Sequence, residues 1–321
     1  MKRSKPMIAI VAGVLAMTGS PASAADDDRA RSRSDRSGPL VIAHRGASAY
    51  APENTIPAFL LAAEQEATFV EFDLRLTKDG RIVLLHDDSL ERTTNVEEVF
   101  PDRGRAEEGG KPGVRRWPLE DFTLADLKRL DAGSWFDAKY SGTAIPTFAE
   151  TIDALRGRSG LFIELKSPER YDGIEKLVLA ELAAKGLDRP GADPRTPVLI
   201  QSFTASSLQT LVTLGTKLPL HFLVSARDAG PWLTAEGLER LKAFATGISP
   251  EKTVLLEHPD AIARARAMGL LVTPYTFRST AVQGFADVRA EMAHHLYVLG
   301  VDGVITDNPD QMPSPPAAAR P

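Results

Sequence analysis

The chain has 321 residues, 43% of them hydrophobic, which is enough for one large globular domain or for two ordinary ones. It contains no cysteine, so disulfide bonds, redox thiols and thiolate metal ligands are excluded. The formal net charge is −5, and this acidic balance argues against a surface that binds nucleic acid.

Residues 1–24 have the pattern of a secretory signal peptide. Three basic residues precede an apolar run over 7–17, and Ala-Ser-Ala at 22–24 forms a small-residue cleavage site. The apolar run is too short to span about 30 Å of hydrocarbon, and no cysteine is available to carry a lipid anchor. We therefore expect an exported protein, periplasmic or secreted, without a stable membrane anchor. Cleavage removes three basic residues and no acidic one, so the net charge becomes −8.

Both ends of the remaining chain are expected to be disordered. Residues 25–38 carry many charges and no aliphatic side chain larger than alanine, and 312–321 are of similar character. Neither segment can bury enough apolar surface to fold. No linker, charge block or repeat divides the sequence between them, so 39–311 is predicted to be a single catalytic domain.

Short strand-like runs alternate with helical patterns along this domain. Strands are expected at 40–44, 69–75, 81–86, 161–165, 198–202, 219–224, 244–248, 270–275 and 302–305. Helices are expected at Pro57–Gln65, Gly173–Ala184, Ala205–Leu214, Ala235–Ala243 and Pro259–Met268. This alternation predicts the α/β class and a closed (β/α)8 barrel of TIM type rather than an open doubly wound sheet. The first strand also lacks the following G-x-G-x-x-G of a dinucleotide-binding fold.

Two of the expected strands are too close together for a crossover helix. FVEFDLRL (69–76) and RIVLLHD (81–87) are separated only by the turn signal TKDG. A parallel connection needs a dozen or more residues, so these two strands must form an antiparallel hairpin within an otherwise parallel barrel.

The hairpin carries polar side chains on one face. Glu71 and Asp73 point to the same side of their strand, where two buried carboxylates repel each other unless a cation lies between them. A turn centred on 78–79 places His86 opposite Glu71, and a turn centred one residue later places it opposite Asp73. Either register brings an imidazole beside the carboxylates.

Other strand ends supply complementary groups. Glu164 adds a third carboxylate, and these hard oxygen ligands favour Ca²⁺ or Mg²⁺ over zinc. Lys166 lies on the same face, either neutralised by the carboxylates or free to bind an anion. After the first strand, His44 can reach the same cavity, Arg45 offers a planar fork for phosphate oxygens, and Gly46 allows a sharp turn. Together these groups indicate acid–base cleavage of a phosphate ester.

The alternation is interrupted between residues 95 and 147. This stretch is polar and glycine-rich with scattered aromatic residues, and DFTLADLKRL (121–130) is its one expected helix. We interpret it as an insertion over one end of the barrel, where long loops usually carry function.

The order and spacing of six motifs over about residues 40–310 resemble the glycerophosphodiester phosphodiesterase family. The motifs are His44-Arg45-Gly46, Pro52-Glu53-Asn54-Thr55, Glu71-x-Asp73 followed by Thr77-Lys78-Asp79-Gly80 and His86-Asp87, Glu164-Leu165-Lys166, Gln201-Ser202-Phe203, and Thr306-Asp307. ERTTNVEEVFPDR (91–103) and PYTFRS (274–279) further resemble the periplasmic, calcium-dependent branch of that family.

The resemblance implies a TIM barrel with a small insertion. Its expected activity is hydrolysis of compounds such as glycerophosphocholine or glycerophosphoethanolamine to an alcohol and sn-glycerol 3-phosphate. The implied cofactor is one divalent cation, Ca²⁺ rather than Mg²⁺, bound by Glu71, Asp73 and Glu164. The implied partner is the small-molecule substrate, and the oligomeric state is left open.

The resemblance also implies a role for each basic residue. Arg45 and Lys166 would hold the phosphate, His44 would be the general base and His86 the general acid. Both direct attack by water and attack by a neighbouring glycerol hydroxyl, through a cyclic phosphate, are compatible with the motifs.

Four further residues are candidates for the pocket: Gln201, Phe203, Tyr275 and Arg278. Gln201 and Phe203 either line the pocket or belong to the packing of the barrel. Many relatives have Trp-Thr-x-Asn where this chain has Tyr-Thr-Phe-Arg. Tyr275 is therefore either a pocket residue or a core aromatic, and Arg278 faces either substrate or solvent. The other histidines, at 221, 258, 294 and 295, are not accompanied by such catalytic groups and are expected in the core packing or at the surface.

Two other functions fit the sequence less well. A lysophospholipase D or a phosphatidylinositol-type phospholipase on the same barrel would need an exposed apolar entry, and the scattered aromatics of 95–147 do not favour one. A non-catalytic glycerophosphodiester-binding protein would tolerate the loss of a histidine or a carboxylate. All of them are present, so catalysis is the favoured interpretation.

Overall fold

The computed structural model describes residues 38–106 and 113–316. The expected signal peptide at 1–24, and the expected linker apart from its last residue, lie outside these ranges. Where the tail was expected to begin, the backbone carbonyls of Met312 and Pro313 accept hydrogen bonds from Arg289 and Tyr297. Within the described ranges, no helix is both long and apolar enough to cross a membrane.

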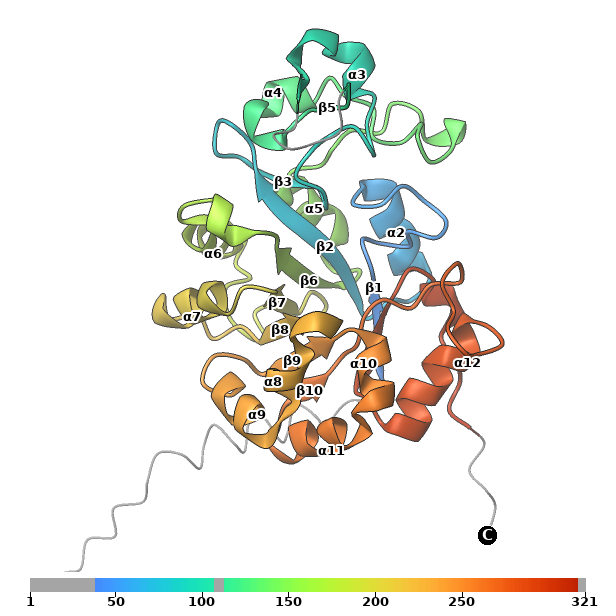
Figure 1. The fold of residues 1–321 in the computed structure, drawn as a ribbon. Helices are drawn as coiled ribbons and strands as arrows, with labels where there is room; N and C mark the ends of the chain where they lie inside the picture. Colours follow the sequence, from blue (N-terminus) through green and yellow to red (C-terminus); the bar gives the residue numbers. More distant parts are fainter. Residues whose placement is uncertain (1–37, 107–112, 317–321) are drawn as a thin grey trace, which may run out of the picture. The chain divides into compact units, whose positions relative to one another are not determined.

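The described chain forms a barrel of parallel strands (Figure 1). The strands are β1 (Leu40–Ala43), β2 (Phe69–Leu76), β6 (Gly160–Leu165), β7 (Val198–Ser202), β8 (Leu220–Val224), β9 (Gly247–Pro250), β10 (Leu271–Val272) and β11 (Gly303–Thr306). Their order is β10-β9-β8-β7-β6-β2-β1-β11. The amides of Asp302 and Ile305 donate to the carbonyls of Val272 and Pro274, which links the two ends of this path. The predicted (β/α)8 barrel is therefore confirmed.

Helices connect the strands and cover the outside of the sheet (Figure 1). They are α2 (Ile56–Glu64), α5 (Phe148–Leu155), α6 (Ile174–Ala184), α7 (Ala205–Thr213), α8 (Ala229–Leu233), α9 (Ala235–Leu241), α10 (Lys252–Glu257), α11 (Pro259–Ala267) and α12 (Val288–Ala293), with a π-helical turn at His294–Leu299. Short 3₁₀ turns lie at Pro101–Arg103, Leu119–Asp121, Ala138–Tyr140, Pro168–Arg170, Ala226–Asp228 and Pro309–Gln311. Amphipathic spacing explains the packing: α5 buries Phe148, Ile152 and Leu155 on one face.

The inside of the barrel changes from apolar to acidic along the strands. An apolar cluster fills the region where the strands begin and comprises Leu40, Ile42, Phe69, Phe162, Leu199 and Ile305. Side chains two residues apart in a strand share a face, so Glu71 and Asp73 follow Phe69, and Glu164 follows Phe162. The acidic layer therefore lies toward the carboxyl ends of the strands, where TIM barrels place their active sites.

The expected hairpin is present, but its register differs from both expected alternatives. Strand β3 (Ile82–Leu84) pairs antiparallel with β2, with Leu74 opposite Leu84. The turn has three central residues rather than two. The Thr77 amide donates to the Arg81 carbonyl, and the Arg81 amide donates to the Thr77 hydroxyl. Each expected register was therefore wrong by one residue, and His86 lies beyond the end of β3.

Three other expected boundaries were also wrong. The strand expected at 244–248 begins at Gly247, and the one expected at 270–275 is β10 alone, because Pro274 has no amide hydrogen to donate. In 121–130, only α4 (Leu124–Leu127) is helical, and it starts at a capping box between Thr123 and Asp126.

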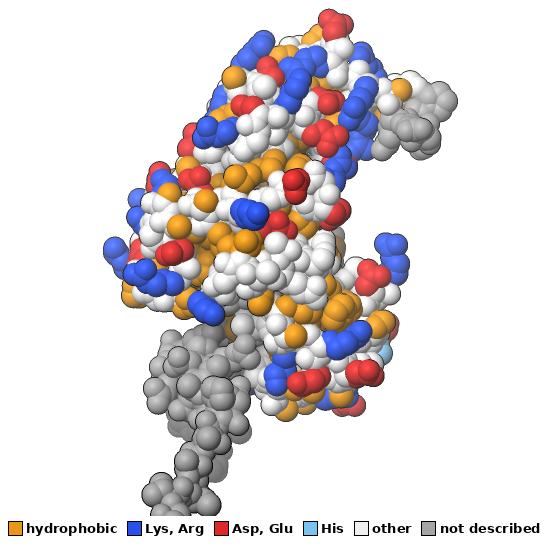
Figure 2. Space-filling model, turned by 90° about the vertical axis from the view of Figure 1, so that its left-hand side faces the viewer, with side chains coloured by type: hydrophobic (Ala, Val, Ile, Leu, Met, Phe, Trp, Pro, Cys, Tyr) orange, Lys and Arg blue, Asp and Glu red, His pale blue; other side chains and the backbone are white. Residues whose placement is uncertain are grey.

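The insertion lies at the end of the barrel reached by β2 and β3, at the top of Figure 1. It contains α3 (Val96–Val99), α4 and the small sheet of β4 (Arg105–Ala106) and β5 (Arg115–Arg116). Its apolar side chains form a second core with β3 and its flanks: Val83, Leu85, Leu90, Val96, Phe100, Trp117, Leu119, Phe122, Leu127, Leu130, Ala132 and Ile145. Figure 2 shows basic and acidic side chains interspersed over this upper end.

Gly46 makes the turn after β1 possible, and its substitution is expected to destabilise the fold. Its φ is +84°, and a Cβ there would lie 2.7 Å from the carbonyl carbon of Ala58 in α2. Gly46→Ala should lower the free energy of unfolding by about 2–4 kcal/mol, because left-handed strain and overpacking add. Gly80 has a φ of +70° but open space around it, so Gly80→Ala should cost only about 1–2 kcal/mol. Urea unfolding of both variants tests this, and equal losses would contradict it.

Candidate active site

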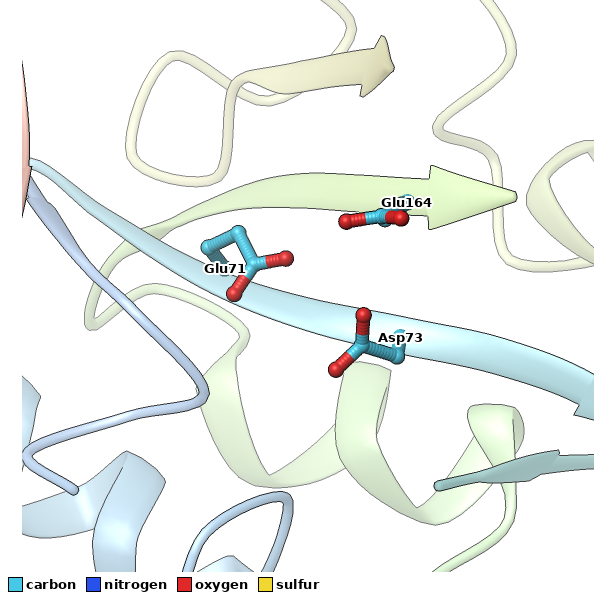
Figure 3. A group of neighbouring side chains, drawn as sticks. All are labelled: Glu71, Asp73 and Glu164. Carbon is cyan, nitrogen blue, oxygen red and sulfur yellow. The ribbon is translucent and has the colours of Figure 1, made fainter. Parts of the chain in front are cut away.

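Three buried carboxylates converge inside the barrel (Figure 3). Glu71 and Asp73 project from β2 and Glu164 from β6, where the parallel register places Asp73 beside Glu164. One oxygen of each carboxylate lies within 4.8 Å of the others. Such a group of oxygen donors could hold a divalent metal ion.

Two cationic side chains contact this cluster. The Lys166 Nζ lies 2.9 Å from Glu164 Oε1 and 3.5 Å from Asp73 Oδ1. The Arg45 Nε lies 3.3 Å from Asp73 Oδ2, and the Arg45 backbone amide donates to Glu71 Oε2 at 2.8 Å. Burial acts to lower the pKa of Lys166, but Glu164 and Asp73 outweigh it and raise the pKa. Lys166 is therefore cationic at neutral pH.

The carboxylates respond to this environment in different ways. Burial and the neighbouring Asp73 and Glu164 raise the pKa of Glu71 well above its usual range. Burial also raises the pKa of Glu164, against the opposing effect of Lys166. Burial acts on Asp73 in the same direction, but Lys166 and Arg45 outweigh it and its pKa is lowered. When all three carboxylates are ionised, their charge exceeds that of the two cations by one, so the cluster favours one further positive charge, either a proton on Glu71 or a metal ion.

Gln201 supports a metal at this position. Its Nε2 donates to Glu71 Oε1 at 3.3 Å, while its Oε1 is buried and finds no hydrogen-bond partner among the described residues. A buried oxygen without a donor is costly. A hard cation bound by the carboxylates would give this oxygen a partner, so the donor set fits Ca²⁺ or Mg²⁺.

His44 is held by an aspartate from the last strand of the barrel. Its Nδ1 lies 2.6 Å from Asp307 Oδ1, and Asp307 Oδ2 also pairs with the Arg278 Nε at 3.2 Å. Burial and the nearby Arg45 lower the pKa of His44 to about 4, although Asp307 opposes this. The imidazole is therefore neutral at neutral pH, and donation from Nδ1 leaves the lone pair on Nε2.

His86 has the same arrangement with its own neighbour in sequence. Its Nδ1 lies 2.6 Å from Asp87 Oδ1. Partial burial acts to raise the pKa of Asp87, but hydrogen bonds from His86 and Arg92 outweigh it and the pKa is lowered. Both histidines are thus oriented by an ionised carboxylate at Nδ1.

These groups surround one cavity of about 130 Å³. It is lined by His44, Arg45, Glu71, His86, Glu164, Lys166, Gln201, Phe203, Leu223, Tyr275, Thr276, Arg278 and Ile305. Asp73 belongs to the acidic cluster, although it is not among the residues that line the cavity. The fold therefore brings together all the residues that sequence reasoning selected.

The outer candidate residues lie at the same cavity. Phe203 is 41% exposed and packs edge-to-face against Tyr275, with ring centres 5.7 Å apart. Both line the cavity, so neither is simply core packing. Arg278 lies at the same cavity, held toward Asp307.

Sequence reasoning missed the partners of the histidines. Asp87 could have been found from its position next to His86. Asp307 could have been found from the closure of the barrel, because β1 pairs with β11 in a register that places Ala43 beside Thr306. The residues that follow these two are His44 and Asp307.

A TIM barrel with an acidic cluster, two oriented histidines and two cations at its catalytic end has the equipment of a phosphoric ester hydrolase. Residues 44–311 match the Glycerophosphoryl diester phosphodiesterase family. The chain belongs to this family and is a phosphoric diester hydrolase.

Known relatives cover most of the chain. A glycerophosphodiester phosphodiesterase of Bacillus subtilis is 36% identical over 279 residues, which is 84% of each protein. One from Haemophilus influenzae is 29% identical and covers 94% of each. Among solved structures, a phosphodiesterase from Oleispira antarctica in complex with the product sn-glycerol 3-phosphate has a TM-score of 0.65 at 30% identity, covering 85% of this chain and 95% of that one.

Proposed function

We propose that this enzyme hydrolyses small, water-soluble glycerophosphodiesters to an alcohol and sn-glycerol 3-phosphate, with a divalent metal and with His44 and His86 as base and acid. The observation that carries the proposal is a cavity with two aspartate-held histidines beside three carboxylates and two cations. The product bound to the Oleispira antarctica relative supports the choice of sn-glycerol 3-phosphate.

Glu71, Asp73 and Glu164 would hold the metal ion. When bound, the ion would supply positive charge that polarises the phosphoryl group. Arg45 and Lys166 would bind the non-bridging phosphate oxygens, since both are cationic and line the cavity beside the acidic cluster. Calcium is the proposed ion, because residues 91–103 and 274–279 resemble the calcium-dependent periplasmic branch.

The two histidines would move the protons. Neutral His44 would accept the proton of the attacking hydroxyl at its Nε2, while Asp307 stabilises the imidazolium that forms. His86 would donate a proton to the oxygen of the departing alcohol, so that no alkoxide is released. The attacking hydroxyl belongs either to water or to the glycerol moiety. In the second case water opens a cyclic phosphate, with the roles of the two histidines reversed.

We also propose that the mature enzyme acts outside the cytoplasm, in the periplasm or the medium. The signal-peptide pattern of residues 1–24 supports this. The amino-terminal sequence of the protein recovered from the medium or periplasm tests it, and the expected first residue is Ala25.

The decisive assay is release of glycerol 3-phosphate from glycerophosphocholine by the purified mature protein. EDTA should stop turnover, and Ca²⁺ should restore it better than Mg²⁺. Turnover that EDTA leaves unchanged would contradict the metal. Turnover of lysophosphatidylcholine alone would favour a lysophospholipase D instead, and binding of glycerophosphocholine without release of product would favour a binding protein.

Replacing Asp307 should impair the base without removing it. In Asp307→Asn the amide can donate to Nδ1 of His44, which favours the tautomer with its proton on Nε2. We expect kcat to fall by about 10²-fold or more, as in other histidine–aspartate pairs. Asp307→Glu should recover part of the loss, and Asp310→Asn, an exposed neighbour, should be neutral. Steady-state kinetics test this, and wild-type kcat in Asp307→Asn would contradict it.

A further inference from the structure

A chain of charged hydrogen bonds joins His86 to the phosphate-binding side of the cavity. Asp87, which holds His86, accepts from the Arg92 Nε at 2.5 Å through its other oxygen. The two terminal nitrogens of Arg92 donate to the two oxygens of Glu53, at 2.9 and 2.7 Å. Glu53 Oε1 also accepts from the Arg45 Nη1 at 2.9 Å. Each residue is therefore hydrogen-bonded to the next in the order His86, Asp87, Arg92, Glu53, Arg45.

Arg92, unlike Arg45, does not line the cavity. It lies in the loop after β3, whereas Glu53 lies in the loop after β1, 39 residues away in sequence. Its side chain is 44% exposed, but its partners are more buried, at 27% for Asp87 and 14% for Glu53. Arg92 therefore ties two catalytic loops together from the solvent side.

The geometry suits only a guanidinium. Arg92 uses Nε for one carboxylate and its terminal fork for the other, so one planar group fixes two carboxylates relative to each other. A lysine has a single charged nitrogen and cannot hold both in the same orientation. Arg278 is the corresponding arginine near His44. Within the described residues, its ion pair is with a single carboxylate, that of Asp307.

We infer that Arg92 is a positioning residue, which sets the spacing between the His86 imidazole and the Arg45 guanidinium by clamping Asp87 to Glu53. The inference rests on the proposed function, because that function assigns the proton to His86 and the phosphate to Arg45. An error of about 1 Å between a proton donor and the bound phosphate can reduce a rate by 10²-fold, so the clamp acts on kcat.

The test compares Arg92→Ala and Arg92→Lys with Arg266→Ala, using glycerophosphocholine and saturating Ca²⁺. Arg266 is a matched control, since its side chain is also 44% exposed and it pairs with Asp302 away from the cavity. We expect kcat to fall by about 10–100-fold in Arg92→Ala, with a melting temperature close to that of Arg266→Ala. Arg92→Lys should retain the fold and recover only part of the rate.

A double-mutant comparison separates positioning from a general loss of stability. If Arg92 acts through Asp87, Arg92→Ala should lower kcat by less than threefold in an Asp87→Asn background. Equal losses with and without Asp87→Asn would overturn the inference. A wild-type kcat in Arg92→Ala would also overturn the inference. If the alanine variant fails to fold, a wild-type kcat in Arg92→Lys would overturn it.

His86→Ala shows which idea has failed. An inactive His86→Ala beside a fully active Arg92→Ala overturns the clamp and leaves the proposed function in place. A fully active His86→Ala removes the proposed acid, and the clamp is overturned with it.

Discussion

His44→Ala is expected to hydrolyse glycerophosphocholine about 10²–10⁴-fold more slowly than the wild-type enzyme, because the attacking hydroxyl loses its proton acceptor. Burial and Arg45 lower the pKa of His44 to about 4 from 6.5, so the base is free over most of the pH range. The acidic limb of kcat/KM in the wild-type enzyme should accordingly lie near pH 4. A limb near pH 6.5 would show that His44 is not the titrating base.

The leaving group distinguishes base from acid. A phosphodiester with a nitrophenolate leaving group needs no protonation, so His86→Ala should recover most of its activity with such a substrate. His44→Ala should not. His258→Ala is the control, because His258 is exposed and lies outside the cavity. Recovery of His44→Ala instead would reverse the assignment.

Glu71→Gln is expected to lower kcat by at least about a hundredfold, because it removes a charged oxygen from the proposed metal site. In the absence of metal, the same substitution should make the folded protein more stable. Burial and the adjacent carboxylates raise the pKa of Glu71 in the folded state. The folded protein then binds this proton more tightly than the unfolded chain, so the stability it confers is present at low pH and lost as pH rises.

Thermal unfolding in EDTA and in Ca²⁺ measures this effect. In EDTA at pH 8, Glu71→Gln should melt at a higher temperature than wild type, and the difference should narrow toward pH 4. Added Ca²⁺ should stabilise wild type but not the variant. Glu175→Gln is the control, since Glu175 is a buried glutamate that binds Ser207 away from the cavity. A variant less stable than wild type in EDTA at pH 8 would contradict the prediction.

The sequence by itself was sufficient for the fold class and for the chemical groups of the cavity. Strand side chains alternate with a period of two, so the spacing of Glu71 and Asp73 already placed both carboxylates on one face. The short link TKDG between the two expected strands required a hairpin, because no crossover helix fits into its four residues. These inferences depend only on local backbone geometry, which is the same in any fold.

Tertiary structure alone decided which residues contact one another. His44 and Asp307 are 263 residues apart and meet only because the barrel closes β11 against β1. Arg92 and Glu53 meet because two loops reach the same rim. Contacts of this kind join distant segments, and their partners follow from barrel closure and loop packing, for which no local pattern exists.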